Sequence, residues 1–255
     1  MKKIKAYILF APGTNCELET QHALLKTGFE VDIFPLKEAI KNPFKIHEYH
    51  LFTLPGGFSF GDDIKAGKVL AIYLKKFFFE ELKKFYEDGK LILGICNGFQ
   101  VLVRSGILPF FDGKQWVSLE INEKGVFEDR WVFLKKERDT PFTRFMEEIS
   151  SIPIAHAEGR FICDEKTIKK IEEEKLVVFR YCDKDGNLIN EYPFNPNGSL
   201  NLIAGICDKN GQILGLMPHP ERAFEKEHFP EGINSKNTGK NFFKGIFEYL
   251  KERFI

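Results

Sequence analysis

One cysteine in this sequence is placed where it could act as a nucleophile. Cys96 follows a short apolar run, residues 91–93, and lies between Gly94 and Gly98. This is the spacing of the nucleophile elbow, G-x-S-x-G, with sulfur in place of oxygen. Glycine is needed there because a sharp strand-to-helix turn leaves no room for Cβ atoms beside a strained nucleophile. A helix over residues 97–105 would favour the thiolate and direct backbone N–H groups at an oxyanion.

A buried structural role is the alternative for Cys96, because free cysteine usually fills apolar space. The second candidate group weighs against it. Residues 217–222 read M-P-H-P-E-R, and the prolines are expected to exclude helix and keep the segment extended, with His219 and Glu221 on one side. A carboxylate can orient an imidazole whose other nitrogen takes a thiol proton. A lone loop histidine is usually structural, but here the sequence predicts a triad of Cys96, His219 and Glu221.

The glycine-rich segment 55–63, P-G-G-F-S-F-G-D-D, follows another expected strand. It does not match a phosphate-binding loop, because five residues rather than four separate Gly61 from Gly67 and no Ser or Thr follows Lys68. It does not match the dinucleotide pattern G-x-G-x-x-G either. A plain turn and an oxyanion donor near Gly57 remain equally acceptable interpretations.

Residues 152–161 alternate in polarity in the manner of a strand. Alternation would place His156, Glu158 and Arg160 on one face. Such a face could be an ordinary solvated edge. It could also bind the carboxylate and ammonium groups of an amino acid.

The remaining pattern is that of an α/β protein in one domain, residues 1–255, with a mostly parallel sheet and antiparallel signals after residue 109. Asn15 could cap a helix with Leu18, His22 and Leu25 on one face. Strands are expected at 6–10, 30–34, 49–54, 91–93, 116–121, 126–135 and 176–181, with a hairpin over 202–216. Further helices are expected at 68–86, 97–105, 141–149 and 237–253.

The amino-acid composition limits the kinds of binding partner and the cellular location that we expect. Lys plus Arg equals Asp plus Glu, 37 of each, so no net charge favours nucleic acid or a membrane surface. No stretch approaches eighteen apolar residues and no signal-peptide pattern opens the chain, so we expect a cytoplasmic protein. The five cysteines include no C-x-x-C pair, so neither a disulfide framework nor a metal site is expected.

Taken together, G-I-C-N-G-F-Q at 94–100 and H-P-E at 219–221 resemble the class I (triad) glutamine amidotransferases. Further blocks resemble one branch of that family, whose members supply ammonia to a synthetase of purine biosynthesis. These blocks lie at 12–17, 55–63, 156–161, 195–200 and 217–223. The resemblance runs almost from end to end and is weaker at 123–148 and 224–240.

The resemblance implies a flavodoxin-like fold and a glutaminase mechanism. Cys96 would attack the side-chain amide of glutamine, with the oxyanion on the backbone N–H groups of Gly57 and Asn97. Gln100 would help hold the amino-acid end of the substrate. The chain itself would need no cofactor or metal, because ATP and Mg would bind only to a separate synthetase subunit. A small third subunit would complete the complex.

Two other functions fit parts of the pattern. A peptidase or other cysteine hydrolase could use the same elbow, but relatives of that kind resemble A-x-C-H-G, whereas Asn97 follows the cysteine here. A non-catalytic, glutamine-binding regulatory subunit is the second alternative. The intact set of Cys96, His219 and Glu221 argues against it.

Overall fold

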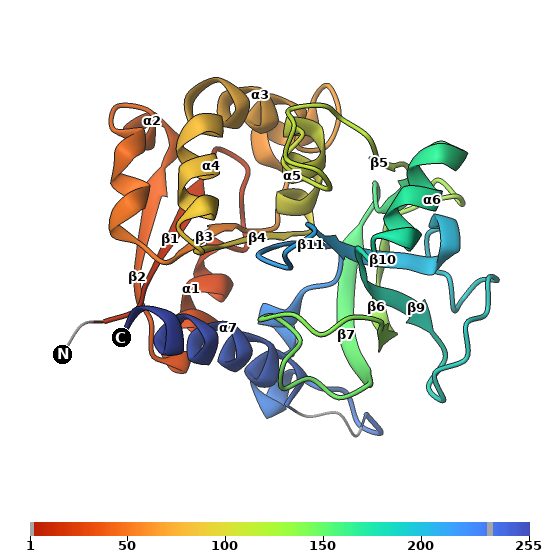
Figure 1. The fold of residues 1–255 in the computed structure, drawn as a ribbon. Helices are drawn as coiled ribbons and strands as arrows, with labels where there is room; N and C mark the ends of the chain where they lie inside the picture. Colours follow the sequence, from red (N-terminus) through yellow and green to blue (C-terminus); the bar gives the residue numbers. More distant parts are fainter. Residues whose placement is uncertain (1–2, 234–236) are drawn as a thin grey trace.

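The computed structural model describes residues 3–233 and 237–255, and its largest element is a nine-stranded sheet (Figure 1). The strand order is β2-β1-β3-β4-β11-β10-β9-β6-β7. The first five strands in that order are parallel: β2 (Glu30–Pro35), β1 (Lys5–Phe10), β3 (Leu51–Leu54), β4 (Leu91–Ile95) and β11 (Ile213–Leu216). This half of the sheet has the order of a flavodoxin-like fold, with β11 as the fifth strand.

The other half of the sheet is antiparallel. It is built from β10 (Ile203–Cys207), β9 (Val177–Cys182), β6 (Glu128–Lys136) and β7 (Ile149–His156). A separate two-stranded sheet pairs β5 (Ser118–Glu120) with β8 (Arg160–Ile162). The predicted fold class, a parallel α/β sheet with additional antiparallel strands, is therefore confirmed.

Helices cover both faces of the parallel half, with α2 to α5 on one side and α1 and α7 on the other (Figure 1). All five residues of β4 are buried, as expected of a parallel strand covered on both faces. The helices are α1 (Glu17–Thr27), α2 (Leu36–Ala39), α3 (Lys68–Phe77), α4 (Phe79–Glu87), α5 (Asn97–Ser105), α6 (Glu165–Glu173) and α7 (Thr238–Phe254). Among the described residues, none of these helices has the length and apolarity to cross a bilayer.

In the first half of the chain, two helices differ from those expected from the sequence. The single helix expected over 68–86 is broken at Phe78, whose φ of −121° is not helical and whose ring is fully buried against Phe52. The break allows α3 and α4 to bury separate apolar faces. The residue at the N-cap position of the first helix is Cys16 and not Asn15, and its side chain makes no capping hydrogen bond with the described residues. Leu18 of this helix is 65% exposed, because the buried face of α1 is formed by Thr20, Ala23 and Leu24.

Differences in the second half concern how segments pair. Residues 141–149 form turns and the start of β7 and not the expected helix, whereas α6 was not expected. The stretch 152–161 is two strands, because the chain turns between His156 and Arg160. The strands expected at 116–121 and 126–135 form as β5, which pairs with β8, and β6, which pairs with β7 and β9. The hairpin expected over 202–216 is confirmed by the antiparallel pair β10 and β11.

Candidate active site

Cys96 occupies the turn between β4 and α5 in a strained conformation, with φ 50° and ψ −105°. Its backbone N–H donates to the carbonyl of Leu216 at the end of β11, at 2.8 Å. A Cβ atom on Gly98 would lie 2.0 Å from the carbonyl oxygen of Leu54, so only glycine fits there. The geometry is that of the nucleophile elbow that the spacing predicted.

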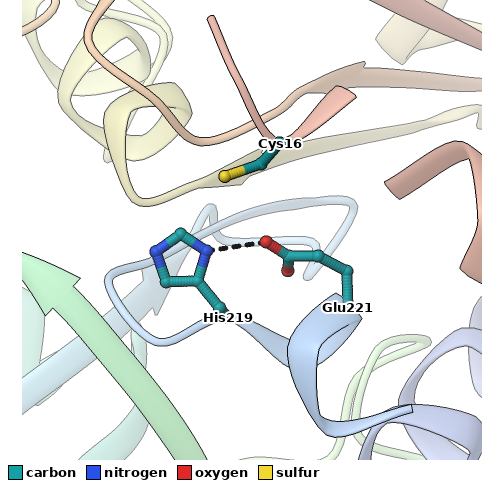
Figure 2. A group of neighbouring side chains, drawn as sticks. All are labelled: Cys16, His219 and Glu221. Atoms are coloured by element: carbon teal, nitrogen blue, oxygen red, sulfur yellow. Dashed lines mark hydrogen bonds and ion pairs between the residues drawn. The ribbon is translucent and has the colours of Figure 1, made fainter. Parts of the chain in front are cut away.

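The histidine and the carboxylate also meet. His219 Nδ1 donates to Glu221 Oε1 at 2.6 Å, and both side chains are buried (Figure 2). The segment is not extended as expected, since a 3-10 helix begins at Pro220 and runs to Ala223. Proline is tolerated at the first position of a helix, where its missing N–H has no helical partner. The backbone N–H of His219 donates to the carbonyl of Pro153 in β7, at 2.8 Å, which fixes the histidine to the sheet.

The surroundings of His219 favour its protonated form. Burial by itself would lower the pKa of this imidazole, but the negative charges of Glu221 and of the Cys96 thiolate outweigh burial and raise it well above its usual value. The other ring nitrogen, Nε2, is buried and has no hydrogen-bond partner in the described part of the chain. It is therefore free to exchange a proton with a nearby thiol.

A cavity of about 170 Å³ opens beside the nucleophile. The Cys96 thiol is 5% exposed and lies 3.7 Å from the carbonyl oxygen of Ala155. Side chains and backbone from four segments surround this space. They belong to Gly57, Phe58, Asp62, Ala66, Cys96, Gln100, Ala155, His156, Ala157 and Glu158. The cavity thus brings the elbow, the glycine-rich turn and the end of β7 together.

Besides the triad and Asn97, the sequence predicted five site residues. Four of them line this cavity: Gly57, Gln100, His156 and Glu158. Arg160 is not among the lining residues, because the turn after β7 puts it at the start of β8. The Gln100 amide donates to the carbonyl of Glu158 at 2.6 Å and accepts from Asn97 Nδ2 at 2.9 Å. Gln100 therefore braces the cavity wall, and its contact with substrate stays a prediction.

The two ionisable side chains after β7 differ in character. His156 donates from Nδ1 to Asn122 Oδ1 at 3.1 Å. Burial, together with the charge of His219, lowers its pKa to about 3, so it lines the cavity as a neutral ring. Glu158 Oε2 accepts from the backbone N–H of Ala66 at 3.3 Å. A carboxylate and a neutral imidazole could therefore face a ligand here.

The predicted oxyanion donors lie on two segments joined by one side chain. Gly57 has a φ of 136°, and a Cβ there would approach the backbone nitrogen of Asn15 to 2.6 Å, so the loop before α1 supports this turn. Asn97 Oδ1 accepts from the backbone N–H of Ser59 at 3.2 Å. The side chain that follows the nucleophile thus holds the glycine-rich turn in place, and the oxyanion role of both residues stays a prediction.

Two residues beside the site were missed. Asp62 lines the cavity, accepts from Asn97 Nδ2 at 3.2 Å and has a pKa that burial raises. The paired aspartates that end the block 55–63 were a signal that could have suggested it. Cys16 lies beside His219. It belongs to the block 12–17 that carries the resemblance, but the local sequence did not indicate that it would meet His219, because this proximity arises only on folding.

Comparisons with known proteins were consistent with one another. Residues 3–250 match the profile of a CobB/CobQ-like glutamine amidotransferase domain. The chain is 46% identical over 253 residues to the phosphoribosylformylglycinamidine synthase subunit PurQ of Methanococcus maripaludis strain C5, covering 97% of this chain and 93% of that protein. The chain is 38% identical over 260 residues to PurQ of Dehalococcoides mccartyi, covering 99% of this chain and 100% of that protein.

Comparison with solved structures also found glutamine amidotransferases. A chain in the structure of PurLQS from Thermotoga maritima superposes with a TM-score of 0.75 and is 35% identical, covering 98% of this chain and 100% of that one. A glutamine amidotransferase from the same organism has a TM-score of 0.55 at 18% identity, and shares the fold.

Proposed function

Because this chain belongs to the family of PurQ subunits of phosphoribosylformylglycinamidine synthase, which are glutamine amidotransferases, we propose that it hydrolyses L-glutamine to glutamate and ammonia. The observation that carries the proposal is the strained elbow at Cys96 beside the buried pair of His219 and Glu221. A vestigial regulatory site would not need to keep either the backbone strain or the buried ion pair.

The reaction follows from the positions of these groups. The Cys96 thiolate attacks the side-chain amide carbon of glutamine, and His219 Nε2 carries the proton taken from the thiol. The developing oxyanion accepts from the backbone N–H groups of Gly57 and Asn97. The imidazolium then protonates departing ammonia, and water hydrolyses the glutamyl thioester. Glu221 keeps Nδ1 protonated throughout, which leaves Nε2 available for each transfer.

The amino-acid end of glutamine would lie toward the wall formed by Gln100, His156 and Glu158. The carboxylates of Glu158 and Asp62 suit the ammonium group of the substrate, since both line the cavity. Arg160, which starts β8 outside the lining, is not assigned a direct contact.

The ammonia would pass to an ATP-dependent synthetase subunit that converts formylglycinamide ribonucleotide to formylglycinamidine ribonucleotide in purine biosynthesis. ATP and Mg would bind to that subunit, with no cofactor in this chain, and a small third subunit would complete the assembly. We also propose that residues 1–255 act as one glutaminase domain in the cytoplasm.

The test separates ammonia release from ammonia use. The complex carrying Cys96→Ala should make no product from glutamine, yet should make product from ammonium salt, and more so at higher pH, where free ammonia is more abundant. The control is Cys163→Ala, which removes a half-buried thiol that is not among the residues lining the cavity and should keep both activities. If an assembled Cys96→Ala complex loses both activities, the cysteine is required for the synthetase chemistry and the proposal is wrong.

A further inference from the structure

A second thiol lies behind the catalytic histidine. Cys16, at the start of α1, is 1% exposed, and its sulfur points toward the ring of His219 (Figure 2). The sulfur, a ring nitrogen of His219 and a carboxylate oxygen of Glu221 all lie within 4.8 Å of one another. The second carboxylate oxygen, Glu221 Oε2, is buried and accepts no hydrogen bond from the described residues. Of these three residues, only Cys16 has no part in the proposed attack on glutamine.

We propose that Cys16, His219 Nδ1 and Glu221 form an inhibitory site for a thiophilic divalent cation, with Zn²⁺ as the best match. Thiolate, imidazole and carboxylate are the ligands that zinc takes in proteins, in tetrahedral sites with bonds of about 2.0–2.3 Å. Ligand atoms in such a site are roughly 3.5 Å apart. The present separations, up to 4.8 Å, therefore need only small side-chain movements, and a water molecule could supply the fourth ligand.

The cation would reach this site from a different side than glutamine. A second cavity, of about 660 Å³, is lined by Glu19, Glu221 and Arg222 among others, and Cys96 is not part of its lining. Arg222 Nη2 donates to the Cys16 sulfur at 3.1 Å, and its Nε lies 3.3 Å from Glu19 Oε1. The guanidinium can keep its contact with Glu19 while it leaves the sulfur, so Arg222 would act as the gate of this site.

Binding there would stop the proposed glutaminase reaction, and this consequence rests on the proposed function. The hydrogen now on Nδ1 bonds to Glu221. A cation on Nδ1 would force the remaining ring hydrogen onto Nε2, because a neutral imidazole carries only one. His219 could then no longer accept a proton from Cys96. Metal binding must also release the proton of the Cys16 thiol, so it should weaken as the pH falls.

Metal binding can be tested without turnover. The chain carrying Cys96→Ala, which has no thiol in the glutamine cavity, is titrated with Co²⁺ and the thiolate-to-cobalt absorption band is followed. We expect one equivalent to bind. The band should be absent from the double variant that carries Cys96→Ala and Cys16→Ala. It should persist in the double variant that carries Cys96→Ala and Cys163→Ala. The proposed site would be overturned if the Cys96→Ala chain showed no absorption band. It would also be overturned if the band remained in the double variant with Cys16→Ala.

Inhibition is tested on the complex with glutamine as the ammonia source. Cys16→Ala should retain turnover and require at least tenfold more Zn²⁺ for half-inhibition, and Cys16→Ser, which keeps the side-chain volume, should also be less sensitive. Saturating glutamine should not protect the wild-type complex. Equal sensitivity of all three proteins would mean that zinc inhibits at a site without Cys16, and would overturn the inhibitory role. Because the cobalt titration does not depend on activity, failure of this site and failure of the glutaminase proposal are distinguishable.

Discussion

In the proposed reaction, His219 can accept a proton from Cys96 only while its ring hydrogen remains on the Glu221 side. The 2.6 Å contact between Nδ1 and Glu221 Oε1 holds that arrangement, and Nε2 is left without a partner among the described residues. The residue-scale chemistry therefore depends on one tautomer in a buried setting.

Replacing the base should be more damaging than replacing its orienting group. His219→Ala removes the proton acceptor, whereas Glu221→Gln keeps an oxygen that can accept from Nδ1. We expect the loss in kcat for Glu221→Gln to be roughly a hundredfold smaller than that for His219→Ala. Steady-state glutaminase assays of the assembled complex measure both. Equal and small losses would contradict the assignment of His219 as the base.

His156 should make the folded protein sensitive to acid. Its pKa is about 3 in the folded state, against an ordinary value of 6.5, so below pH 6.5 the unfolded chain binds a proton that the folded chain does not. The free energy of unfolding should fall with pH in this range by up to about 1.4 kcal/mol per pH unit. His156→Gln should lack this contribution.

Urea unfolding at pH 8, 6 and 5 measures the effect. The difference between wild type and His156→Gln should be constant above pH 7 and should shrink as the pH is lowered, because only the wild type loses stability through this ring. Parallel curves at all three pH values would show that His156 takes up a proton in the folded state as readily as in the unfolded chain.

At the scale of elements, the nucleophile depends on the close packing of β3, β4 and α5. Gly98 lies on the first turn of α5 against Leu54, the last residue of β3. Any side chain at this position would push the helix away from the sheet. The elbow is therefore supported by the neighbouring strand as well as by its own turn.

Gly98→Ala should disrupt the site. Its Cβ would lie 2.0 Å from a backbone oxygen that cannot move by itself, and such overpacking costs about 1–3 kcal/mol. Glutaminase activity should be lost, because the shift of α5 changes the direction of its N–H groups at the nucleophile. The control is Gly125→Ala, where no atom of the described residues beyond its chain neighbours lies within 4 Å of the added Cβ and only the left-handed backbone costs about 1–2 kcal/mol. Loss of activity in the control alone would contradict the packing argument.

At the scale of the whole molecule, exposed aromatic side chains lie next to the cavity. Phe58, which follows Gly57, is 42% exposed, and its ring contacts that of Phe127, which is 49% exposed. Large apolar side chains that remain exposed together mark surfaces that other proteins cover. A synthetase bound there would also fix the Gly57 turn.

We therefore expect the isolated chain to have weak glutaminase activity that rises on complex formation. Phe127→Ser should lower the affinity for the synthetase by about tenfold or more. The gain in activity on complex formation should fall with it. Leu188→Ser is the matched control, because Leu188 is similarly exposed at 45% and the structure places it in the loop after β9. Full activity in the isolated chain, unchanged by the synthetase, would contradict this prediction.

Local sequence determined the parts of this protein that depend on few neighbours. The elbow at Cys96, the apolar strand before it and the β10–β11 hairpin each follow from residue types at short range, since glycine and apolar runs restrict the local backbone. The three residues proposed as the triad could also be named from their types and context, and their catalytic roles stay a prediction.

Tertiary structure alone decided which distant residues share a site. The turn after β7 separates Arg160 from His156 and Glu158, which alternation had placed together, and only the pairing of β8 with β5 explains it. His219 and Glu221 meet through a 3-10 helix anchored to β7 and not through an extended segment. Cys16 comes to lie beside them across some two hundred residues of chain, because such proximity is set by packing and is invisible to local periodicity.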